Sequence, residues 1–140
     1  MREWDDLVAS GLIEAVEPDR PTAEKWINDA KRHLEAAHTI EAIDPSGAYV
    51  LAYDAARKSV AAALLMTGHR VRSRPRSPQA LAQFTKALAK QTSEPALRQF
   101  DRLRRERSRS EYGSRTFGKA EVDEAIKTAE AILEACARQI

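Results

Sequence analysis

Residues 47–67 read GAYVLAYDAARKSVAAALLMT, and this stretch decides the fold. Alanine and leucine favour a helical backbone, and the apolar residues fall on several sides of the helix rather than on one. A helix that is apolar nearly all round is typical of the centre of a bundle. Ser46 is placed to cap its start, and Gly68 is typical of a helix C-terminus. We therefore predict a central helix in an all-α protein.

The flanking sequence predicts further helices that pack around the central one. Apolar residues at intervals of three and four predict helices over 2–15, 21–43 and 119–138. Two more helices are expected to begin at Ser77-Pro78 and at Ser93-Glu94-Pro95, where capping residues precede an apolar stripe. Alternating strand patterns are nearly absent.

Short loops between these helices indicate how they are arranged. Helices joined by short loops run antiparallel to each other. We therefore expect an up-and-down antiparallel bundle of four core helices plus one or two short extra helices. We expect a single domain over residues 1–140, with its core at about 22–138 and an N-terminal helix and linker in 1–20.

Composition narrows the class of protein. Charged residues make up 31% of the 140, no apolar run approaches the ~20 residues that span a bilayer, and the polar start MREWDD does not resemble a signal peptide. We expect a cytoplasmic protein with no membrane partner. The single cysteine, Cys136, excludes an intrachain disulfide, and its place on an apolar stripe predicts a buried, unreactive thiol.

The charges are unevenly distributed along the chain. Between His69 and Arg115, 11 Arg and 2 Lys stand against 4 acidic residues, a net charge of +9. The whole chain carries +2, so the remainder carries −7. A basic segment of this size is typical of a surface for nucleic acid or another polyanion. An acidic protein partner or a second copy of the chain would also fit it.

The first part of the basic segment, HRVRSRPR at 69–76, is expected to be a loop with arginine at every second position: Arg70, Arg72, Arg74 and Arg76. These arginines either clamp a phosphate backbone, with an affinity that falls steeply with salt, or form a solvated loop. No aromatic residue is interleaved with them, which argues against sequence reading by base stacking.

The second part, RERSRSEYG at 105–113, ends the expected fifth helix. Its inward stripe changes there from Leu97, Phe100 and Leu103 to polar residues that include Arg107 and Glu111. Arginine is rarely buried without a partner. The stripe therefore predicts either a phosphate site, to which Arg104 and Arg109 would also contribute, or an internal ion-pair network.

In the network alternative, two pairs hold the central and fifth helices in register. Glu111 lies within i,i+4 reach of Arg107, and Asp54 and Arg57 form a second polar pair on the central helix. In the phosphate alternative the same residues support the site.

The residues AYDAARK at 52–58, the basic loop and RLRRERSRSEYG at 102–113 together resemble the HEPN superfamily, over about 22–138. The pattern is similar to the Arg-x-Arg-Asn-x-x-Glu-Tyr signature of small stand-alone bacterial HEPN proteins. The resemblance implies a dimeric helical bundle and, in many members, a metal-independent ribonuclease. In these, arginine stabilises charge on the phosphate and a nearby histidine transfers protons, with the sites of two chains facing each other.

This chain departs from that pattern because the motif histidine is missing. In one register, Arg107 is followed by Tyr112 where histidine is expected. In another, Arg105 is followed at the histidine position by Ser110, with Tyr112 two residues further on. Tyrosine is a poor general base at neutral pH because its pKa is ~10. The second register resembles toxins paired with a nucleotidyltransferase, which implies that such a partner could nucleotidylate Tyr112.

Three functions stay open at this point: an RNA-binding protein or ribonuclease of a toxin–antitoxin or defence system, a non-catalytic nucleotide-binding dimer, and a scaffold for a protein partner. The sequence leaves open whether the chain is an enzyme. Because it has no Cys-x-x-Cys, no His-Glu-x-x-His and no glycine-rich phosphate loop, we expect no metal and no cofactor. The expected partners are RNA or a nucleotide, a second copy of the chain, and an antitoxin.

Overall fold

The computed structural model describes residues 4–73, 79–112 and 116–140, with the backbone alone for 110–112. Its central element is the helix α3 (Pro45–Met66), which confirms the predicted central helix. The predicted cap at Ser46 is wrong, because the helix begins one residue earlier at Pro45 and Asp44 caps it. The Asp44 carboxylate accepts a hydrogen bond from the Gly47 N–H at 2.9 Å.

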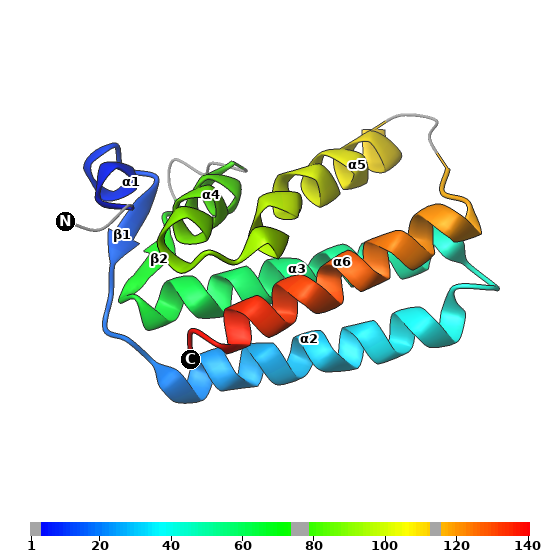
Figure 1. Ribbon diagram of the computed structural model, residues 1–140, viewed down its shortest axis with the longest axis horizontal. Helices are drawn as coiled ribbons and strands as arrows, with labels where there is room; N and C mark the ends of the chain where they lie inside the picture. Colours follow the sequence, from blue (N-terminus) through cyan, green and yellow to red (C-terminus); the bar gives the residue numbers. More distant parts are fainter. Residues whose placement is uncertain (1–3, 74–78, 113–115) are drawn as a thin grey trace.

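Three more long helices surround α3 (Figure 1): α2 (Arg20–Ile40), α5 (Phe100–Tyr112) and α6 (Lys119–Ala137). α2 runs antiparallel to α3 and packs along most of its length, α6 packs against both, and α5 packs on α3. These four helices form the core of an all-α bundle, as predicted from the sequence.

Small side chains allow the helices of the core to lie close together. α2 turns Ala23, Ala30 and Ala37 toward the interior, and all three are fully buried. α3 buries six alanines, twice as many as α2, and it has neighbours on several sides. Close packing of this kind stabilises the bundle through many short contacts between helix backbones and side chains.

The N-terminal region departs from the prediction. The expected helix over 2–15 is only α1 (Asp5–Ala9), and it is followed by the strand β1 (Ile13–Ala15). Gly11 separates the two with a backbone φ of +78°, a conformation that ends a helix. β1 pairs antiparallel with β2 (His69–Val71), a strand where a basic loop was expected. Ile13, which pairs with Val71, is almost completely buried.

The remaining elements cover the end of α3 that leads into β2 (Figure 1). α4 (Ala80–Thr92) packs with α1 there, and the rings of Trp4 and Phe84 meet edge to face with centroids 5.5 Å apart. The predicted start of α4 at Ser77-Pro78 lies outside the described residues. The predicted fifth helix begins as a 3-10 helix, η1 (Pro95–Gln99), and continues as α5.

Of the helices that the structure describes, none combines the length and apolar character that crossing a bilayer requires.

Candidate nucleic-acid interface

The buried side of α5 continues in arginine toward its C-terminal end. Phe100 and Leu103 are buried. Arg104 follows Phe100 by four residues, and Arg107 follows Leu103 by four, so both lie on the same side of the helix as the apolar stripe. Both arginines are partly buried. This is the change from apolar to polar that the sequence predicts.

Tyr53 on α3 packs against α5 one turn before Arg104. Its ring stacks on that of Phe100, with centroids 5.9 Å apart. Burial raises the pKa of the Tyr53 hydroxyl, and the positive charges of Arg57, Arg104 and Arg107 oppose that rise. Charges have this effect only when they lie near the titrating group. We call Tyr53 and these three arginines the arginine face.

Asp101 and Glu106 pair with arginines one turn away on α5, and two of these arginines, Arg105 and Arg109, lie on its outer side. Asp101 Oδ1 accepts two hydrogen bonds from Arg104, and its Oδ2 lies 3.2 Å from Arg105 Nε. The Arg104 side chain is 19% exposed, whereas that of Arg105 is 62% exposed. Arg109 donates to Glu106 at 3.3 Å and is also exposed. The geometry therefore places Arg104 and Arg107, but not Arg105 and Arg109, on the arginine face.

The predicted pair on α3 is formed, and it reaches α2. Asp54 Oδ1 accepts from Arg57 Nε at 2.9 Å and Nη2 at 2.7 Å. Asp54 Oδ2 lies 3.5 Å from His33 Nε2 and 3.7 Å from Lys58 Nζ. His33 Nε2 in turn contacts Lys58 Nζ at 2.7 Å. These contacts tie α3 to α2, whereas the predicted network joined α3 to α5.

The end of the motif is described only in part. α5 includes the backbones of Ser110, Glu111 and Tyr112. Their side chains lie outside the described residues. The pairing of Glu111 with Arg107 and the roles of Ser110 and Tyr112 therefore stay predictions.

The basic stretch after α3 is ordered against the N-terminal region. Arg70 lies in β2 and its Nε donates to Glu14 Oε1 at 2.8 Å, across the two-stranded ribbon. The Arg72 guanidinium packs over Gly11, so that a methyl group there would lie 3.1 Å from Nη1. The expectation of a loop is thus wrong for Arg70. Arg74 and Arg76 lie outside the described residues.

The ribbon is far from the arginine face. Tyr49, in the first turns of α3, donates through its hydroxyl to the Leu103 carbonyl on α5, whereas β2 follows the other end of α3 (Figure 1). Tyr53 and Arg57 lie 13 and 9 residues before Met66, where α3 ends, so the 1.5 Å rise per residue puts roughly 14–20 Å of α3 between the two basic groups. They do not form one site.

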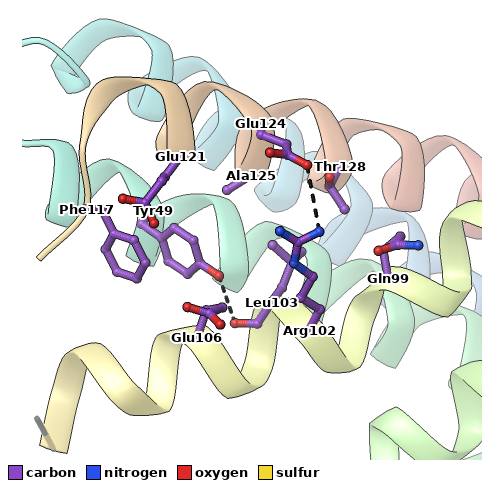
Figure 2. A pocket seen from close by; sticks show the side chains of 10 residues that line it. All are labelled: Tyr49, Gln99, Arg102, Leu103, Glu106, Phe117, Glu121, Glu124, Ala125 and Thr128. Atoms are coloured by element: carbon purple, nitrogen blue, oxygen red, sulfur yellow. Dashed lines mark hydrogen bonds and ion pairs between the residues drawn. The ribbon is translucent and has the colours of Figure 1, made fainter. Parts of the chain in front are cut away.

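A neighbouring side of α5, which faces α6, is hollowed instead of basic. A cavity of about 100 Å³ lies between α3, α5 and α6 (Figure 2). Its lining consists of Tyr49, Gln99, Arg102, Leu103, Glu106, Phe117, Glu121, Glu124, Ala125 and Thr128. Three carboxylates outnumber the one arginine, whose Nη1 lies 3.8 Å from Glu124 Oε1. This acidic cavity is unsuited to a phosphate because its carboxylates would repel one.

Other reactive side chains are engaged in the core or in ion pairs. Burial raises the pKa of the Cys136 thiol to about 12, which agrees with the prediction of an unreactive cysteine. His38 Nε2 lies 2.7 Å from Glu130 Oε1 and ties α2 to α6. Among the described residues, no three His, Cys, Asp or Glu side chains are grouped so as to hold a metal ion.

Comparison with known proteins agrees with this architecture. A family model for the HEPN domain matches residues 23–140. The chain belongs to the HEPN family. The resemblance drawn from the α3 and α5 motifs is thereby confirmed. A search of curated proteins and a search of solved structures each returned no match.

Sequence reasoning missed two features of this HEPN chain. Tyr53 was not singled out, although its four-residue distance from Arg57 places both on one side of α3. The acidic cavity was missed as well, because Glu106 is far along the chain from Glu121 and Glu124, and only the packing of α5 on α6 brings them together.

Proposed function

We propose that this HEPN protein binds RNA through its phosphate groups at the arginine face. The observation that carries the proposal is the position of Arg104 and Arg107, partly buried on α5 beside the Tyr53 phenol. A guanidinium group stays charged in such a place and donates two parallel hydrogen bonds to phosphate oxygens. Partial burial strengthens these bonds because less water competes for them.

The same residues favour binding over rapid cleavage. None of the three histidines, His33, His38 and His69, lies on α5. Tyrosine has an ordinary pKa of ~10, and burial raises the pKa of Tyr53 further, so Tyr53 keeps its proton at neutral pH. It would therefore donate to a phosphate instead of accepting a proton. We therefore propose RNA binding with slow cleavage or none. A role for Tyr112 in proton transfer, or as a target of a nucleotidyltransferase partner, stays a prediction.

A second copy of the chain is part of the proposal. HEPN domains often act as dimers, and α3 exposes Val50 (37% exposed) one turn from Tyr53. Two chains that meet near this surface would bring two arginine faces close to one RNA strand. Sedimentation of the purified protein tests this part.

The binding test compares two arginines of α5. A fluorescein-labelled single-stranded oligouridylate is titrated by anisotropy with the wild type, Arg107→Ala and the control Arg102→Ala, which alters the acidic cavity instead. Charge-assisted hydrogen bonds contribute about 1.5–3 kcal/mol, so Arg107→Ala should weaken binding by roughly 10- to 100-fold. Arg102→Ala should change it little. Equal effects of the two variants would contradict the proposal.

Cleavage is tested on the same RNA in EDTA, with Tyr112→His as a third variant. We expect little cleavage by the wild type and a gain in Tyr112→His, since histidine transfers protons near neutral pH. Fast wild-type cleavage that is lost in Arg107→Ala would show that the protein is a ribonuclease. It would overturn the proposal that cleavage is slow or absent. Cleavage that is equal in wild type and Arg107→Ala would point to a contaminating nuclease.

A further inference from the structure

Two parts of the chain share a five-residue pattern of an aromatic residue, an aspartate, two other residues and an arginine. The first is YDAAR at 53–57 on α3, and the second is FDRLR at 100–104 on α5. The structure brings the two together, because the rings of Tyr53 and Phe100 stack at 5.9 Å with an interplanar angle of 25°. Since α3 and α5 run antiparallel, the two patterns extend in opposite directions from this stack (Figure 1).

The aspartate orients the arginine in the same way in both copies. Asp54 Oδ1 accepts from Arg57 Nε at 2.9 Å and Nη2 at 2.7 Å. Asp101 Oδ1 accepts from Arg104 Nε at 3.0 Å and Nη2 at 2.8 Å. Each guanidinium is therefore held by one edge, and its Nη1 takes part in neither bond. A guanidinium that is already oriented loses less entropy when it binds an anion.

The same bonds fix the direction in which each arginine side chain leans along its helix. An i,i+3 bond draws each arginine back along its own helix, toward the aspartate that follows the aromatic residue. Because the helices are antiparallel, both arginines are drawn toward the Tyr53–Phe100 stack, one from each side. The charges of both arginines act on the Tyr53 hydroxyl, and its proton makes it a third donor.

We infer that Tyr53, Arg57 and Arg104 form a single phosphate clamp across α3 and α5. The inference rests on the proposed RNA binding and extends it, since it assigns one backbone phosphate of the RNA to donors from two helices. Arg107, one turn further along α5, adds positive charge beside the clamp. A bound phosphate would also join α3 to α5 through hydrogen bonds.

The test is the same oligouridylate titration with Arg57→Gln. The matched control is Arg32→Gln on α2, because Arg32 pairs with Asp29 at the same i,i+3 spacing but follows no aromatic residue and is 67% exposed. We expect Arg57→Gln to weaken binding about tenfold, as the loss of a charge-assisted hydrogen bond predicts, and Arg32→Gln to leave it unchanged. Arg57→Lys should recover only part of the loss, since lysine keeps the charge but not the planar fork.

Three results separate this inference from the proposed function. A loss in Arg107→Ala with normal binding by Arg57→Gln would overturn the clamp and keep the RNA-binding proposal. Normal binding by both would overturn both. Equal loss in Arg57→Gln and Arg32→Gln would mean general charge attraction and would also overturn the clamp. Circular dichroism of each variant confirms that it is folded. If Arg57→Gln is not folded, Arg57→Lys replaces it in the titration.

Discussion

The two sides of α5 differ in chemistry although they come from the same 13 residues. On the side of α3, the three arginines near Tyr53 outnumber their two aspartate partners, Asp54 and Asp101, which makes that side basic. On the side of α6, the glutamates of the cavity outnumber Arg102. Arginine is frequent throughout the motif, but the helical repeat places Arg104 and Arg107 toward Tyr53 and places Glu106 toward α6.

The helix that faces each side of α5 determines whether that side is basic or acidic. α6 supplies Glu121 and Glu124 in its first two turns, and Glu121 is held there by a 3.2 Å hydrogen bond from the Gly118 N–H. α3 supplies an aromatic ring and an oriented arginine instead. A basic segment in a sequence therefore does not specify an anion site until the facing helix is known.

The largest expected effect comes from truncating Phe100, which packs α5 against α3. Phe100 is fully buried and stacks on Tyr53. Phe100→Ala should lower the free energy of unfolding by about 3–5 kcal/mol, because a large buried side chain is lost and a cavity is left. Urea unfolding measures this loss, and Phe100→Leu should lose much less. A loss below ~1 kcal/mol in Phe100→Ala would show that α5 does not depend on this contact.

A sharper test compares the two tyrosines of α3. The Tyr49 hydroxyl lies beside the acidic cavity and donates to the buried Leu103 carbonyl at 3.1 Å. Tyr49→Phe should therefore cost about 0.5–1.5 kcal/mol of stability, since the tyrosine hydrogen bond is lost while the Leu103 carbonyl keeps its partner within α5. Tyr53→Phe should leave stability nearly unchanged and weaken RNA binding. Urea unfolding measures the stability and anisotropy measures RNA binding. If Tyr53→Phe lowered stability and Tyr49→Phe weakened RNA binding, the assignment of the two sides would be wrong.

The smallest expected effects concern two glutamates outside this region, whose pKa values are shifted in opposite directions by their neighbours. A hydrogen bond from Arg138 lowers the pKa of Glu94, so its stabilising effect is present near neutral pH and is lost as pH falls through the lowered value. Hydrogen bonding with the Asp123 carboxyl raises the pKa of Glu41 above its ordinary value of 4.5. Its contribution is therefore present at low pH and is lost as pH rises through the raised value.

Thermal unfolding as a function of pH measures the difference between these two glutamates. Glu94→Gln should lower the melting temperature at neutral pH and have no effect in acid. Glu41→Gln should raise the melting temperature at neutral pH and have no effect in acid. Both shifts should be small because the groups are near the surface. Shifts of the same sign at neutral pH would contradict these assignments.

Much of the fold could be predicted from the sequence because it depends on local pattern. The apolar run of 47–67 could be buried only at the centre of a bundle, and the stripe of 119–138 only as a helix packed against it. The two short strands could not be predicted this way. His69–Val71 is a strand because it pairs with Ile13–Ala15, a partner more than fifty residues away that local propensity does not register.

The sequence by itself therefore determined the helical class, the central helix, the HEPN motif and the buried cysteine, since each follows from residue type and spacing along one helix. Only the tertiary structure decided which arginines of α5 face Tyr53, which lie in solvent, and where the acidic cavity is. Those features depend on how antiparallel helices are placed against one another. Packing of side chains from distant parts of the chain determines that placement, which the period of a single helix does not encode.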